Sequence, residues 1–165
     1  DADRVIASMM TAGFDNQAVN WGSKVEQGSL GWALLATGAP GWEGTVDYGA
    51  LDDFQDNDQS ENYQKTALLA AGLGGLGRST PEAVSEMAEA IGRNITKQSA
   101  WSRAIGAAAV RKESGTVVLL AAAGLQARDW RKVPPHHLYH IVKALNAVGL
   151  GAEARMIAAE AVSFG

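Results

Sequence analysis

Five apolar segments of this chain end with the same three-residue pattern. A small or apolar residue is followed by glycine and then usually by a hydrophobic residue, at Ala12-Gly13-Phe14, Thr37-Gly38-Ala39, Ala71-Gly72-Leu73, Ala123-Gly124-Leu125 and Val148-Gly149-Leu150. Helices commonly end at a residue with positive φ, which glycine adopts without a steric clash. The pattern therefore predicts a series of short helices, each ended by its glycine.

Composition favours an all-α fold. The 165 residues include 30 alanines and 19 glycines but only three Phe and three Tyr, and alanine favours helices whereas aromatic residues favour strands. We expect one all-helical domain over residues 1–165, a piece of a longer or processed protein because it begins at Asp1. Its antiparallel helical hairpins are expected to stack as a short, irregular α-solenoid or right-handed superhelix.

Apolar residues at helical spacing give the positions of the expected helices. They cover residues 3–13, with Asp3 as N-cap, 28–37, 63–73, 101–112, 116–123, 135–148 and 154–162. A further helix runs to Gly92, with Ser79 as its cap and Pro81 in the first turn. Because residues 116–123 are apolar all round, that helix should be central. Residues 39–61, rich in glycine and then in aspartate, are expected to form a long acidic loop.

Charge and cysteine content exclude several kinds of protein. The chain has no cysteine, so disulfides, thiolate metal sites and thiol catalysis are excluded. The longest apolar run, 116–125, is about half the length of a membrane span, so we expect a soluble cytoplasmic or periplasmic chain without membrane insertion. Residues 1–65 hold eleven acidic and three basic residues, against seven and eleven in residues 66–165, which suggests an acidic layer folded against a basic remainder.

The final helical pair resembles the tetratricopeptide repeat over residues 135–163. The likeness consists of the glycine turn Gly149-Leu150-Gly151, the pair Glu153-Ala154 that opens the second helix, and Ala161 near its end. Leu138, Ile141 and Leu145 stand where that family's first helix carries inward residues, whereas Val142 departs from the small residue that the family prefers. The resemblance implies a superhelical scaffold that binds proteins or peptides along a concave face.

The glycine-rich run from Gly72 to Ser79 is close to a phosphate-binding loop. Arg78 stands where the loop needs lysine, Pro81 lies where a helix should already donate amides, and residues 117–123 offer no carboxylate for magnesium. The run is therefore predicted to be a flexible connector between helices.

Two groups of residues could hold a cation. His136, His137 and His140 lie at a helix start, and His136 and His140 have the i, i+4 spacing of many zinc sites, but no third ligand is evident. We expect a surface or interface trio of neutral imidazoles. The run from Asp52 to Glu61 has oxygen donors for calcium, but Glu61 and Ala67 stand where that loop needs glycine and glutamate, so a solvated loop is favoured.

One basic cluster could contact phosphates. Arg128, Arg131 and Lys132 flank Trp130, a combination found in nucleic-acid-binding proteins. Because the whole chain is acidic, we expect no nucleic-acid partner, and we expect Trp130 to cover a helix end.

These features favour a non-catalytic helical-repeat module that binds or scaffolds a protein or peptide. No residue is assigned a catalytic, cofactor-binding or metal-binding role, because the serines and acids already have explanations as caps and loop residues. The alternative is a helical accessory domain of a larger enzyme, one acting for instance on the cell envelope. The full-length gene distinguishes the two, since a catalytic domain before Asp1 favours the alternative.

Overall fold

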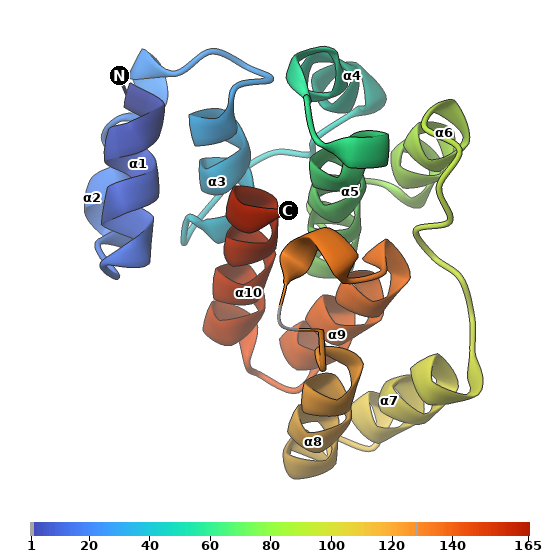
Figure 1. The fold of residues 1–165 in the computed structure, drawn as a ribbon. Helices are drawn as coiled ribbons and strands as arrows, with labels where there is room; N and C mark the ends of the chain where they lie inside the picture. The colour runs from blue at the N-terminus through green and yellow to red at the C-terminus, as the bar shows by residue number, and fades with distance from the viewer. Residues whose placement is uncertain (1, 128) are drawn as a thin grey trace.

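The computed structural model describes residues 2–127 and 129–165, which form ten α-helices and three short 3₁₀-helices (Figure 1). The α-helices are α1 Ala2–Thr11, α2 Asp15–Val19, α3 Leu30–Gly38, α4 Tyr48–Asn57, α5 Gln64–Leu76, α6 Pro81–Ala90, α7 Ala100–Val110, α8 Ser114–Gly124, α9 Pro135–Ala147 and α10 Gly151–Phe164. The 3₁₀-helices are η1 Gly22–Lys24, η2 Glu61–Tyr63 and η3 Trp130–Lys132. The prediction of an all-α fold is confirmed.

Helix α5 is the central element of the molecule. It contacts α3, α4, α6, α9 and α10, and its most extensive contact is with α9. Leu68, Leu69 and Leu73 are completely buried, as are the alanines between them, because neighbours cover the helix on several sides (Figure 1). Tyr63, expected to belong to this helix, instead precedes it and is exposed.

Helix α8 is peripheral, so the prediction that residues 116–123 form the central helix is wrong. Val117 and Ala121 are the residues of α8 that are buried, whereas Leu119 is 73% exposed. The helix packs against α7 and α9 at one end of the molecule (Figure 1). An apolar surface all round a helix does not reveal how many neighbours that helix has.

Of the five glycines expected to end helices with positive φ, three do not have positive φ. Gly13 and Gly149 have φ of 77° and 84°, as predicted, whereas the glycines that follow α5 and α6 with positive φ are Gly77 and Gly92. Gly72 lies inside α5, where an added Cβ would be 3.0 Å from the Cβ of Ala158 on α10. At Gly124 a Cβ would be 2.5 Å from the Trp101 ring. These glycines permit close approach between helices.

The same holds at the end of α3. An added Cβ on Gly38 would clash with the Cε atom of Met10 on α1 and lie 3.1 Å from the Cβ of Ala159 on α10. Gly38 thus lets two helices approach α3 from different sides.

Residues 39–61 are not one long loop, because they contain helix α4. The carboxylate of Asp47 accepts a hydrogen bond from the Ala50 amide and caps this helix. Leu51 and Phe54 are buried on one side. Asp53 and Asp56 are exposed and Asp52 is half-buried, so these acidic residues belong largely to the solvated side of a helix and not to a loop.

Two predicted caps have other partners. Thr80, not Ser79, caps α6 by accepting from the Ala83 amide, while the Ser79 hydroxyl donates to the Val46 carbonyl. Asp3 lies inside α1, where its Oδ1 atom accepts from the Ser29 hydroxyl. The same oxygen accepts from the Gly31 amide, which ties α1 to the positive end of the α3 dipole.

The hairpins expected at the C-terminal end are present. Helices α9 and α10 pack together around Gly149, and α7 packs on α8. Their stacking as an α-solenoid stays a prediction. Contacts between α3 and α10, and between α5 and α9, join segments that are distant in the sequence.

Candidate functional site

The three histidines form part of an aromatic contact between α7 and α9. The ring centroid of His137 lies 4.7 Å from that of Trp101 and 4.8 Å from that of His136. The His140 ring is 6.4 Å from Trp101 in an edge-on arrangement. Of the two expected positions, surface or interface, the cluster takes the interface between helices, and His140 is only 7% exposed.

Backbone carbonyls determine which nitrogen of two of these rings carries the proton. His140 Nε2 lies 2.9 Å from the Lys97 carbonyl, and His137 Nδ1 lies 2.9 Å from the Gly124 carbonyl. A carbonyl can only accept, so each of these nitrogens is the donor. Burial lowers the pKa of His140, and burial and nearby positive charge lower the pKa of His136, which favours neutral imidazoles.

The carboxylates of the acidic segment are spread over separate protein contacts. Asp53 accepts from the Gln27 side chain, and Asp52 accepts from the Tyr48 hydroxyl. Asp58 accepts from Ser60 and from Thr66 at the start of α5. In the described part of the chain, no three His, Cys, Asp or Glu residues are grouped so that they could hold a metal ion.

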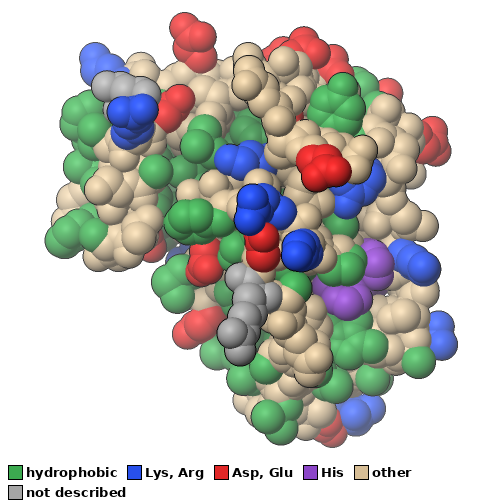
Figure 2. Space-filling model, in the orientation of Figure 1, with side chains coloured by type: hydrophobic (Ala, Val, Ile, Leu, Met, Phe, Trp, Pro, Cys, Tyr) green, Lys and Arg blue, Asp and Glu red, His purple; other side chains and the backbone are tan. Residues whose placement is uncertain are grey.

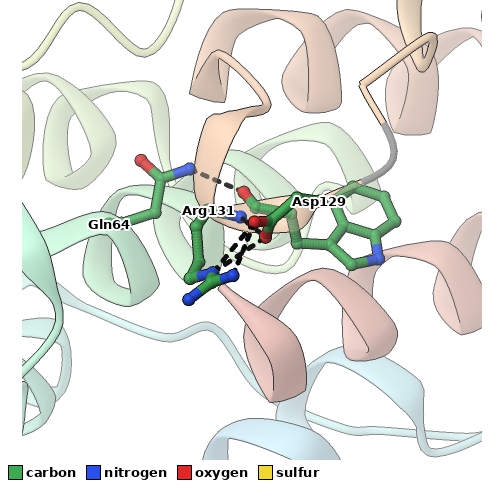
Figure 3. A network of polar contacts seen from close by, with 4 residues as sticks. Gln64, Asp129 and Arg131 are labelled. Carbon is green, nitrogen blue, oxygen red and sulfur yellow. Dashed lines mark hydrogen bonds and ion pairs between the residues drawn. The ribbon is translucent and has the colours of Figure 1, made fainter.

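The glycine-rich run is part of a helix, and residues of the basic cluster bond to other residues of the protein. Residues 72–76 are helical and belong to α5, so the prediction of a flexible connector there is wrong. Trp130 donates its indole N–H to Glu160 on α10, and Arg131 forms an ion pair with Asp129 at 2.7 Å (Figure 3). Arg128 lies outside the described residues.

Within the described helices, none has the length and apolar character needed to cross a bilayer.

An apolar groove lies between α1 and α10, with α3 as its floor. Its volume is about 570 Å³. Leu34 and Gly38 of α3 line the bottom, Met10 lines one wall, and Met156 and Phe164 line the other. Met156 is 62% exposed and Phe164 is 59% exposed, so large apolar side chains of α10 border a concave surface.

The rim of this groove is acidic. Asp15 lies at the α1 side, and Glu160 lies at the α10 side. Glu160 also borders the adjoining hollow lined by Trp130 and Arg131. The groove can therefore accept an apolar group whose surroundings carry positive charge.

A second concavity, the polar pocket, lies at the start of α5 and has a volume of about 540 Å³. Asn62, Tyr63, Gln64, Arg93 and Arg131 are among the residues that line it. Figure 2 shows Lys and Arg side chains gathered in the middle of this face of the molecule, with carboxylates among them.

Two successive residues of the polar pocket have left-handed backbone conformations. Asn62 has φ 53° and ψ 36°, and Tyr63 has φ 54° and ψ 40°. This conformation costs a non-glycine residue roughly 1–2 kcal/mol. Such residues gather at functional sites when the surrounding structure holds them in place.

Sequence reasoning missed both concavities. Residues 60–64, 91–93 and 131 come together only in the folded chain, and the groove joins helices from opposite ends of the sequence. The asparagine before Tyr63 was the only local signal, because asparagine tolerates the left-handed region better than most residues.

Comparison with protein families, curated proteins and solved structures identified no relative: no family model, no curated sequence and no solved structure matches this chain significantly.

Proposed function

We propose that this chain is a non-catalytic helical module that binds a protein or peptide in the groove between α1 and α10. The observation that carries the proposal is the exposure of Met156 and Phe164 beside a concave apolar floor. Exposed apolar surface around a groove is typical of interaction sites. Methionine side chains adapt to different apolar partners because they are unbranched and flexible.

The acidic rim supports a particular kind of partner. Asp15 and Glu160 favour basic residues on either side of an apolar anchor. An amphipathic helix can lay such anchors into a groove of this kind. The partner is therefore a segment with apolar anchors flanked by Lys or Arg.

The resemblance of the last hairpin to a tetratricopeptide repeat adds to this proposal. Helix α10, which forms one wall of the groove, is the second helix of that hairpin. Membership of that repeat family stays a prediction.

A displayed-peptide library tests the proposal without a known partner. We expect enriched peptides to share apolar anchors with flanking basic residues, and a synthetic consensus peptide to bind saturably in fluorescence polarisation. Met156→Glu and Phe164→Glu should each weaken that binding by about tenfold or more, because anchor contacts contribute most of the affinity.

Val110→Glu and Leu119→Glu are the matched controls. These residues are 83% and 73% exposed on α7 and α8, away from the groove, so the affinity should not change. A library without saturable binders, or equal effects of all four substitutions, contradicts the proposal.

A further inference from the structure

The polar pocket is separate from the groove and has the size of a small-molecule site. Its 540 Å³ falls within the range of about 300–1,000 Å³ common for ligand pockets. Its walls come from four places in the sequence: residues 60–64 before and at the start of α5, with Glu61 as the acidic residue among them, residues 91–93 after α6, Arg131 in η3, and Gly165 after α10.

Hydrogen bonds hold these walls together. Arg93 donates from Nη1 to the Asn62 carbonyl and from Nη2 to Gln64 Oε1, both at 2.8 Å. Gln64 in turn donates from Nε2 to the carbonyls of Trp130 and Val133, both at 2.9 Å (Figure 3 shows the bond to Trp130). Gln64 is only 4% exposed, so its own bonds are largely shielded from water, whereas the bond from Arg93 to the Asn62 carbonyl is exposed. Together these bonds link the walls of the pocket to one another.

In the described part of the chain, Arg93 has no carboxylate as a partner. Both of its hydrogen-bond acceptors are neutral oxygens, and Glu61, which lines the same pocket, forms no ion pair with it. Arg131, by contrast, is bonded through its guanidinium to both carboxylate oxygens of Asp129. A guanidinium has five N–H donors, so Arg93 can hold the pocket wall and still offer donors and charge to a ligand.

Tyr63 gives the pocket a planar apolar surface. The residue is 41% exposed, and its backbone is in the left-handed conformation. The backbone strain at Asn62 and Tyr63 thus accompanies an exposed aromatic residue that lines the same pocket as Arg93. Planar groups stack favourably on aromatic rings and on guanidinium groups.

We propose that the polar pocket binds a small organic anion, with Arg93 contacting its carboxylate or phosphate group and Tyr63 contacting its planar part. Guanidinium groups bind both kinds of anion through charge-assisted hydrogen bonds.

Titration of the ¹⁵N-labelled chain with benzoate, phenyl phosphate and neutral benzamide at constant ionic strength tests the proposal. One or both anions should shift the amide resonances of residues 60–64 and 91–93 saturably, and benzamide should not. Benzoate alone assigns the site to carboxylates, and phenyl phosphate alone assigns it to phosphates. Equal shifts with benzamide, or no saturable shift in these segments with either anion, overturn the proposal.

Substitution of Arg93 tests the assigned contact. Arg93→Gln should weaken binding of the anion by about tenfold or more, the loss expected for a hydrogen bond to a charged group. Arg103→Gln, an exposed arginine on α7, should leave the affinity unchanged.

Because Arg93 also holds Asn62 and Gln64, the substitution is repeated with Asn62→Gly, which removes the strain at residue 62. Equal anion affinities of the Asn62→Gly chain with and without Arg93→Gln overturn the assignment to Arg93, and a tenfold difference supports it.

Discussion

Gly75 on α5 packs directly against Val142 on α9: a Cβ added to the glycine would lie 3.0 Å from the valine Cβ. The same Cβ would lie 2.8 Å from the carbonyl oxygen of Tyr139, which cannot move without the helix. At this crossing the small residue is on α5 and the large one is on α9. Val142 is the residue that departs from the tetratricopeptide pattern. The valine side chain fits at this crossing because α5 has a glycine, Gly75, opposite it.

Gly75→Ala should therefore destabilise the protein, although alanine has the higher helix propensity. Overpacking of a filled contact costs roughly 1–3 kcal/mol. Gly106→Ala on α7 is the control, because a Cβ there meets nothing within 4 Å and should stabilise by roughly 0.5–1 kcal/mol. Urea denaturation measures the change in the free energy of unfolding for each variant. If both substitutions stabilise the protein, Gly75 is not closely packed against α9.

Asn62→Gly should stabilise the protein. Glycine avoids the steric cost of φ 53° at this position but loses more backbone entropy on folding, which leaves a gain of roughly 0.5–1 kcal/mol. Asn20→Gly, where φ is −64°, should be neutral or destabilising. Midpoints of thermal unfolding compare the two, and a lower midpoint for Asn62→Gly than for Asn20→Gly contradicts the strain at residue 62.

The free energy of unfolding should fall as pH decreases below about 6.5. Burial lowers the pKa of His140 in the folded state. The hydrogen bond to the Lys97 carbonyl opposes this shift, and the positive charges of Lys143 and His137 add to it. The unfolded state, with an ordinary histidine pKa near 6.5, therefore binds the proton first. The stabilising contribution is present above that pH and is lost as pH falls towards the folded-state value.

His140→Gln should reduce this pH dependence, because the amide can still donate to the Lys97 carbonyl but does not titrate. Urea midpoints at pH 7.5 and 5.0 measure the difference. Part of the dependence should remain, since the pKa of His136 is also lowered. An unchanged slope in the variant would remove His140 as its source.

Leu119→Ala should change the free energy of unfolding by less than about 0.5 kcal/mol, as exposed substitutions usually do. Leu138→Ala, at a completely buried position of α9, should cost roughly 2–5 kcal/mol. Chemical denaturation of both variants tests the peripheral position of α8. A cost at Leu119 equal to that at Leu138 would mean that α8 is covered in the folded chain.

The sequence by itself was sufficient for features that depend on neighbours along the chain. Alanine content and apolar spacing predicted the all-α class, and the glycines at 13 and 149 end their helices with positive φ as expected. The cap of α6 lies one residue from its predicted position, at Thr80 instead of Ser79, whereas Asp3, predicted to cap α1, lies inside that helix. These features follow from backbone conformation within a few residues.

Only the tertiary structure decided which glycines end helices and which let helices touch. Gly13 and Gly72 occur in the same local pattern, yet the first has positive φ and the second lies inside α5 against Ala158. The central position of α5, the groove beside Met156 and the polar pocket around Arg93 likewise depend on segments far apart in the sequence. A glycine adopts whichever conformation has the lower free energy, a turn that ends the helix or a helical conformation in close contact with another helix. That contact forms only when the partner helix is in place.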